Sequence, residues 1–114
     1  MINRTRNLLT VVEGIAQARD IDPADINNVW KALARHPQVM EQFAGEMKAA
    51  MAPGKLDALT KELIYLAVSV TNQCEYCIAS HGAMARAKGM TDEVHEEFMA
   101  VVLAAQKGNK IAMA

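Results

Sequence analysis

The chain has 114 residues, of which 52% are hydrophobic and only 4% aromatic, and its formal net charge is −1. This length is typical of one domain, and the hydrophobic content excludes a disordered chain. Because there is no block of basic residues, the composition argues against nucleic acid or an anionic membrane surface as a partner.

Helical periodicity runs through almost the whole chain. We expect a first helix over about Asn3–Arg19. Asp22-Pro23 then provides an N-cap and a first-turn proline for a second helix, which His36-Pro37 ends. A third helix follows, and Pro53-Gly54 marks the turn after it.

The fourth predicted helix, over about Asp57–Thr71, is apolar on most of its sides, which is typical of a buried helix. A fifth helix starts near Cys74 and stops at Gly89. Thr91 caps a sixth helix, which we expect to end near Gly108. The sequence therefore predicts an all-α fold of about six helices.

We expect these helices to form a single compact domain over residues 1–114. Six short helices would leave part of the apolar fourth helix uncovered, and eight methionines add adaptable apolar surface. These features favour a homo-oligomer, with a compact monomer as the alternative.

No apolar segment is long enough to direct the chain into a membrane. The N-terminal apolar run stops at Glu13, before it reaches the length of a signal-peptide core. The longest uncharged run near the centre, Leu63–Cys74, is too short to span a bilayer. We therefore expect a cytoplasmic protein without a membrane partner. In that reducing compartment a C-x-x-C pair is more often catalytic or metal-binding than structural.

The reactive side chains of the chain gather between Glu62 and His81. Cys74 and Cys77 form a C-x-x-C pair, and His81 follows four residues later. On a helix these three positions share one stripe. The helix N-terminus favours a thiolate at Cys74, and His81 can accept the proton of Cys77. The pattern predicts a site for thiol redox chemistry.

Glu62 is expected to join this site from the fourth helix. If the fourth and fifth helices form an antiparallel hairpin that turns near Asn72, Glu62 and His81 lie at similar heights along it. A carboxylate at the edge of a buried face either finds a partner or becomes protonated. Pairing with His81 would create a Glu–His–Cys proton relay in which Glu62 orients the imidazole.

Other interpretations of these residues remain open. The two cysteines could be half of a zinc site completed by His81 and by His95 or Glu62, although no second C-x-x-C is present. They could also be an incidental pair, and Glu62 alone could be a surface charge that pairs with a lysine. We expect neither a metal nor a cofactor.

The pattern E-x11-C-x-x-C-x3-H, formed by Glu62, Cys74, Cys77 and His81, resembles the signature of the alkylhydroperoxidase D-like branch of the carboxymuconolactone decarboxylase family. The resemblance extends over about Leu56–Phe98. It implies an all-α fold that assembles into homo-trimers or homo-hexamers. It also implies a peroxidase whose cysteine thiolate attacks a hydroperoxide before the two cysteines form a disulfide.

The resemblance further implies a role for each residue. Glu62 and His81 would form the proton relay, Cys77 would be the activated thiol, and Cys74 would exchange with a dithiol reductant such as a lipoyl- or thioredoxin-like protein. Longer alkylhydroperoxidases hold two copies of the helical unit and a histidine between the cysteines, whereas this chain has one unit and Tyr76.

Two alternative functions follow from the same residues. The chain could be a thiol–disulfide exchange protein or redox sensor that does not turn over peroxide efficiently. It could also be a lyase like the decarboxylases of the family. Those enzymes generally lack the cysteine pair, so the presence of both cysteines argues against the lyase.

Overall fold

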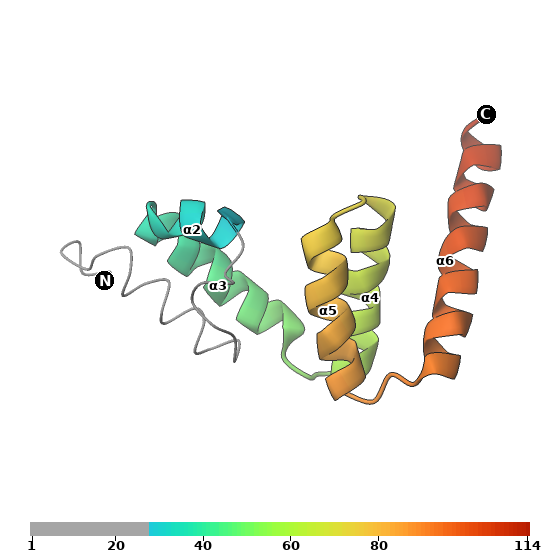
Figure 1. Cartoon of the computed structure of the whole chain (residues 1–114), viewed down its shortest axis with the longest axis horizontal. Helices are drawn as coiled ribbons and strands as arrows, with labels where there is room; N and C mark the ends of the chain where they lie inside the picture. The colour runs from blue at the N-terminus through green and yellow to red at the C-terminus, as the bar shows by residue number, and fades with distance from the viewer. Residues whose placement is uncertain (1–27) are drawn as a thin grey trace. The chain divides into compact units, whose positions relative to one another are not determined.

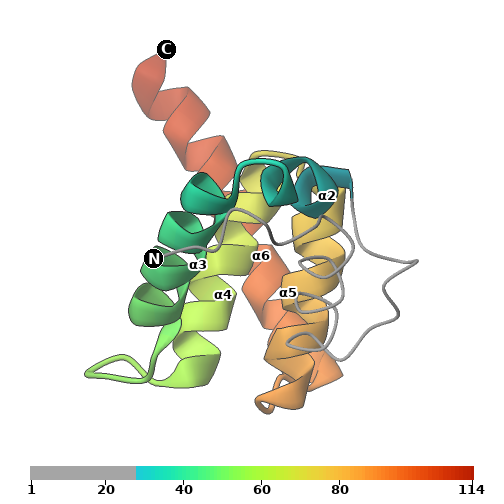
Figure 2. The ribbon, with the colours of Figure 1, turned by 90° about the vertical axis from the view of Figure 1, so that its left-hand side faces the viewer.

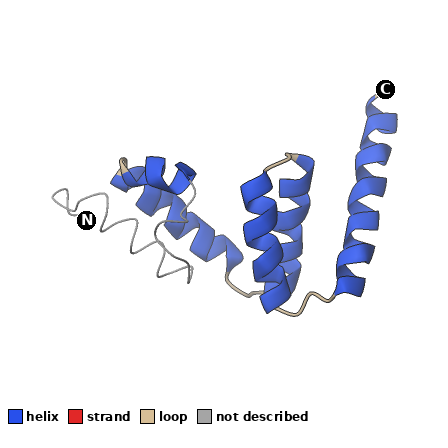
Figure 3. Ribbon diagram, viewed as in Figure 1, coloured by secondary structure: helices blue, strands red, loops and turns tan. Residues whose placement is uncertain are grey.

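The computed structural model describes residues 28–114, and every regular element in that part of the chain is a helix (Figure 1, Figure 3). These helices are α2 (Asn28–Ala34), α3 (Pro37–Met51), α4 (Ala58–Thr71), α5 (Glu75–Ala87) and α6 (Asp92–Met113). The all-α class is therefore confirmed. The first predicted helix, and the start of the second at Asp22-Pro23, lie outside the described residues.

The chain divides into two compact units, residues 1–50 and residues 51–114. In the first unit, α2 ends at Ala34 and α3 begins at Pro37, so the predicted break at His36-Pro37 is confirmed. Trp30 of α2 and Phe43 of α3 have ring centroids 6.0 Å apart, and this contact joins the two helices. The single domain expected over residues 1–114 stays a prediction.

An antiparallel hairpin of α4 and α5 forms the centre of the second unit (Figure 1, Figure 2). α4 begins after Asp57, whose carboxylate accepts a hydrogen bond from the backbone N–H of Thr60 at 2.7 Å. After α4, Gln73 adopts a left-handed backbone with φ 58°. The backbone N–H of Cys74 then donates to the carbonyl of Ser69 at 3.0 Å, which closes the helix end and reverses the chain.

The core of this unit lies between α4, α5 and the start of α6. Its buried apolar members are Leu66, Ala85 and Met90. Partly buried apolar side chains pack around them: Leu59, Leu63, Val70, Ile78, Val94 and Phe98. The stripe of α4 that supplies Leu66 also buries Glu62 and Ser69. Polar groups therefore enter the interior on the α5 side of α4.

α6 starts as expected but is longer than the sequence suggested. The hydroxyl of Thr91 accepts a backbone N–H of the first turn at 3.2 Å, which confirms the predicted cap. The expectation that this helix ends near Gly108 is wrong, because it continues to Met113. Gly89 has the left-handed φ of 113° that terminates α5, whereas Gly108 is accommodated inside the helix at a cost of about 1 kcal/mol relative to alanine.

The side of α4 that faces away from α5 is apolar and exposed. Ile64 and Val68 on this side are 50% and 56% exposed, and the large apolar residues Val101, Leu103 and Ile111 are exposed on α6. Within residues 28–114, no helix combines the length and the apolar character needed to cross a membrane.

Candidate functional site

α5 carries three of the four predicted site residues. Cys74 is its N-cap, Cys77 lies in its first turn, and His81 follows one turn later. The two cysteines form a disulfide, with Cα atoms 5.3 Å apart, and both are half-buried. The structure thus holds the pair in its oxidised form, within one helical turn of an imidazole on the same stripe.

Glu62 of α4 joins this stripe through His81. His81 Nδ1 and Glu62 Oε2 are 2.7 Å apart, and the two residues are only 7% and 1% exposed. The α4–α5 hairpin therefore brings together the two residues that the sequence predicted to pair. Because an ionised carboxylate only accepts hydrogen bonds, Nδ1 carries the proton and Nε2 is the ring nitrogen left for proton exchange.

The second oxygen of Glu62 binds a lysine that the sequence analysis did not identify. Lys88 Nζ donates to Glu62 Oε1 at 2.7 Å, from the C-terminal end of α5. Burial by itself raises the pKa of Glu62, but the hydrogen bonds and positive charges of Lys88 and His81 together bring this pKa below its ordinary value. Glu62 is therefore a carboxylate anchored at both oxygens.

Tyr65 is the second residue that the sequence analysis did not assign to the site. Its ring stacks on the imidazole of His81, with centroids 3.6 Å apart and planes inclined by 21°. Ser69, one turn along α4, donates its hydroxyl to the carbonyl of Tyr65 at 2.9 Å. The imidazole is thus fixed by a hydrogen bond at one edge and by an aromatic ring on one face.

The spacing of Tyr65 and Lys88 in the sequence could have indicated that both residues lie near the site. Tyr65 follows Glu62 by three positions and therefore shares its face of α4. Lys88 follows His81 by seven positions and therefore shares its stripe of α5. What the spacing could not show is that a lysine at a helix end bends back to a carboxylate 26 residues earlier in the chain.

The other two histidines belong to other parts of the chain. His36 is exposed in the turn between α2 and α3. His95 is in the first turn of α6, 6.3 Å from the ring of Phe98, and it borders a small pocket of about 280 Å³ on another face of α5. Tyr76, between the cysteines, is half-buried. The structure therefore separates His95 from the Glu62–His81 pair.

Metal binding was an open alternative for the cysteine pair. Within residues 28–114, no three or more His, Cys, Asp and Glu side chains are arranged to hold a metal ion. His81, which the zinc interpretation needs as a ligand, has its Nδ1 bound to Glu62. The contacts of this group are the hydrogen bond between His81 and Glu62 and the disulfide at the start of the same helix, α5.

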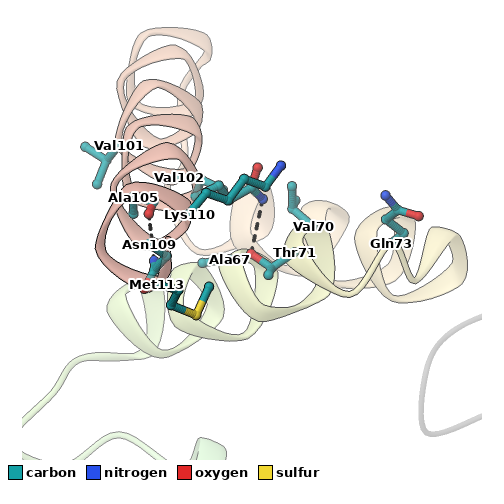
Figure 4. A pocket seen from close by; sticks show the side chains of 11 residues that line it. Ala67, Val70, Thr71, Gln73, Val101, Val102, Ala105, Asn109, Lys110 and Met113 are labelled. Carbon is teal, nitrogen blue, oxygen red and sulfur yellow. Dashed lines mark hydrogen bonds between the residues drawn. The ribbon is translucent and has the colours of Figure 1, made fainter.

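A groove lies between α4 and α6 in the second unit (Figure 4). It has a volume of about 790 Å³ and is lined mainly by apolar side chains, among them Ala67, Val70, Val101 and Met113. At its edge the amide of Gln106 donates to the hydroxyl of Thr71 at 3.2 Å. None of the four predicted site residues lines this groove, so it is a feature separate from the redox stripe.

Comparison with known proteins identifies a family that this chain matches. The model of the carboxymuconolactone decarboxylase family matches residues 37–114. Among solved structures, the alkylhydroperoxidase AhpD core from Rhodospirillum rubrum is similar, with a TM-score of 0.76 and 40% sequence identity. That similarity covers 93% of this chain and 77% of the solved one.

Two similar sequences come from other bacteria. An uncharacterized protein of Cupriavidus necator is 37% identical over 78 residues, which are 68% of this chain and 69% of that protein. Uncharacterized protein 4 in the cox locus of Paracoccus denitrificans is 42% identical over 53 residues, 46% of this chain and 48% of that protein. The family match includes the whole α4–α5 hairpin.

Proposed function

The chain belongs to the carboxymuconolactone decarboxylase family, and we propose that it is a thiol-dependent peroxidase that reduces hydroperoxides through Cys74 and Cys77. The observation that carries the proposal is the buried Glu62–His81 pair on the stripe that also holds the disulfide. A two-cysteine peroxidase needs a thiolate, a group that accepts its proton, and a second thiol that captures the oxidised sulfur. The resemblance to an alkylhydroperoxidase core adds support.

The proposed reaction starts from the reduced pair. The thiol of Cys77 passes its proton to Nε2 of His81, while Nδ1 stays bonded to Glu62. The thiolate attacks one oxygen of the hydroperoxide, the O–O bond breaks, and Cys77 becomes a sulfenic acid. The leaving alkoxide takes the proton from the imidazolium and departs as an alcohol. The sulfur is oxidised by two electrons and the peroxide is reduced by two.

Disulfide formation and reduction complete the cycle. The thiol of Cys74 attacks the sulfenic sulfur of Cys77, releasing water and forming the disulfide that the structure shows. A dithiol reductant, such as a lipoyl- or thioredoxin-like protein, then reduces this bond and leaves as a disulfide itself. The cycle converts one hydroperoxide and one dithiol into an alcohol, water and one disulfide. A cytoplasmic location, where thiols are kept reduced, is part of the proposal.

We also propose that the protein functions as a homo-oligomer, a trimer or a hexamer. Ile64 and Val68 of α4 are exposed apolar side chains, and Val101 of α6 is an exposed apolar residue that lines the groove of Figure 4. Exposed apolar surface of this kind is typical of subunit interfaces. Light scattering at micromolar concentration tests this part, and a monomer mass would contradict it.

The peroxidase activity is tested by stopped-flow oxidation of the reduced protein with hydrogen peroxide and an organic hydroperoxide. We expect rapid loss of both thiols and, by mass spectrometry, a Cys74–Cys77 disulfide. Cys74→Ser should accumulate a sulfenic acid at Cys77, whereas Cys77→Ser should lose the rapid phase. These matched variants identify which sulfur the peroxide oxidises.

Two outcomes would contradict the peroxidase. If peroxide leaves both thiols free but an oxidised dithiol converts them rapidly, the chain is a thiol–disulfide exchange protein. If both cysteines can be replaced without loss of a lyase activity on a lactone, the site serves the decarboxylase chemistry of the family name.

A further inference from the structure

Lys88 connects the end of α5 to the buried carboxylate at the centre of the site. Its Nζ is 2.7 Å from Glu62 Oε1, while Oε2 of the same carboxylate is 2.7 Å from Nδ1 of His81. The side chain of Lys88 is 37% exposed, whereas that of Glu62 is 2% exposed. One ammonium group at the edge of the core therefore contacts the side of Glu62 that His81 does not.

The contact between Lys88 and Glu62 affects the charge state of the Glu62–His81 pair. A buried carboxylate with a single imidazole partner has two ways to lower its energy: it takes up a proton, or it holds the imidazole as a cation. Either state disturbs a relay in which His81 must accept a proton from a thiol. The ammonium of Lys88 balances the charge of Glu62 without using the imidazole, so Glu62 stays ionised while Nε2 remains able to accept a proton.

We propose that Lys88 is a positioning residue for thiol oxidation: it anchors and neutralises the Glu62 carboxylate so that His81 keeps Nδ1 on Glu62 and Nε2 for proton exchange. Within residues 28–114 the ammonium of Lys88 donates to Glu62, so Lys88 acts through Glu62 and His81. Its kinetic role rests on the proposed peroxidase function, but its effect on the ionisation of Glu62 does not.

Other groups around the carboxylate determine how the test must be designed. α5 contributes His81, Lys88 and, once the pair is reduced, the two thiols; α4 contributes the phenol of Tyr65, which stacks on His81. α6 carries His95, but this residue borders a pocket on another face of α5. Titrating the oxidised protein removes the thiols from the measurement, because disulfide-bonded cysteines do not titrate.

The first arm of the experiment follows the ionisation of Glu62 directly. Its side-chain carboxyl carbon is observed by ¹³C NMR in the oxidised protein over about pH 3 to 8, and Glu62→Gln assigns the signal. In Lys88→Met we expect the titration midpoint of Glu62 to move to higher pH, because burial is no longer offset by the ammonium. Lys88→Arg should restore most of the parent midpoint, since it keeps the charge.

The second arm measures peroxide oxidation of the reduced protein as a function of pH. Lys88→Met should be slowed by about threefold to tenfold near pH 6, less than the loss of an acid–base group itself, and the deficit should shrink as the pH rises. Lys107→Met is the matched control, because Lys107 is an exposed lysine of α6 that takes no part in the site. It should match the parent in both arms.

Each result decides the proposal. A Glu62 midpoint in Lys88→Met equal to that of the parent would overturn it, as would Lys88→Arg behaving like Lys88→Met. Lys88→Gln covers the case in which Lys88→Met does not fold, and parent-like titration in Lys88→Gln would show that the charge is not needed. If the parent itself does not react with peroxide, the peroxidase proposal fails, while the NMR arm still tests whether Lys88 holds Glu62 ionised.

Discussion

The two faces of α4 reverse the usual distribution of polar and apolar side chains. The face toward α5 buries Glu62, whereas the opposite face exposes Ile64 and Val68. Burying a charge is costly unless it is paired, and exposing contiguous apolar surface is costly unless a partner covers it. Glu62 is paired with both His81 and Lys88, whereas Ile64 and Val68 stay exposed. We interpret the first as a reaction site and the second as a subunit interface.

The largest test of the reaction face is His81→Ala. Without the imidazole, no group in the relay takes the proton of Cys77, and general acid–base assistance is typically worth ~10²–10⁴-fold in rate. We expect peroxide oxidation at pH 7 to slow by a factor in that range. Stopped-flow kinetics on the reduced variant measures it, with circular dichroism as the control for folding.

The pH dependence of this defect separates a base from a structural residue. A thiolate reacts without help once the pH exceeds the pKa of its thiol, so the deficit of His81→Ala should shrink at high pH. Glu62→Gln should be slowed less than His81→Ala, because the imidazole stays and loses only its orienting charge. If His81→Ala reacts like the parent at pH 7, the histidine is not a base and the chain is better described as a simple thiol exchanger.

The apolar face is tested by Val68→Lys. A lysine there would have to be buried between subunits, and we expect the dissociation constant of the oligomer to rise by at least about tenfold. Val39→Lys is a matched control, because Val39 of α3 is 55% exposed and Val68 is 56% exposed. Sedimentation velocity compares the two variants. Unchanged assembly in Val68→Lys would show that this face is not the interface.

A smaller effect is expected on stability when Glu62 is changed to glutamine. The change weakens two hydrogen bonds to charged or buried partners, and we expect the free energy of unfolding at pH 7 to fall by about 1–3 kcal/mol. Urea unfolding of the parent and of Glu62→Gln measures the difference. Equal stability would mean that the two bonds do no more than compensate for the burial of Glu62.

This difference should also depend on pH in a defined direction. The pKa of Glu62 lies below its ordinary value, because its hydrogen bonds and the nearby charges outweigh burial, so the unfolded chain binds the proton more tightly than the folded one. The stabilisation is therefore fully present above the pKa of Glu62 in the unfolded chain, about 4.3. It is lost as the pH falls through the lower pKa of Glu62 in the folded protein. The difference in the free energy of unfolding between the parent and Glu62→Gln should become smaller below about pH 4.

The smallest effect concerns the turn between α4 and α5, which lies directly before Cys74. Gln73 has φ 58°, a region where glycine avoids the steric conflict of a Cβ atom. Gln73→Gly should stabilise the protein by no more than about 1 kcal/mol, since the greater freedom of glycine in the unfolded chain offsets part of the gain. Thermal unfolding measures it, and Gln73→Val should be destabilising by contrast.

Local spacing predicted the helices well wherever a cap or a breaker marked their ends. Thr91 accepts a backbone N–H as the predicted cap of α6, Asp57 caps α4 where that helix was predicted to begin, and Pro37 begins α3. The end of α6 was missed because Gly108 resembles a helix terminator. Gly89 adopts the left-handed backbone that such a role requires, but Gly108 continues the helix.

The sequence by itself determined which residues share a face, because helical spacing depends only on positions along one helix. It thereby aligned Cys74, Cys77 and His81, and the short connection at Asn72 was enough to place Glu62 opposite His81. Only the tertiary structure decided that Lys88 reaches the second oxygen of Glu62, since that contact depends on how closely α5 packs against α4 at its far end.

The same distinction applies to the outer face of α4. Its apolar pattern was visible in the sequence, but a helix that is apolar on most sides can be covered by its own chain or by another subunit. The positions of α5 and α6 decided which side stays open: α5 covers Leu66, while Ile64 and Val68 remain exposed. Burial depends on what packs against a residue from elsewhere in the fold, and neighbouring residues do not specify it.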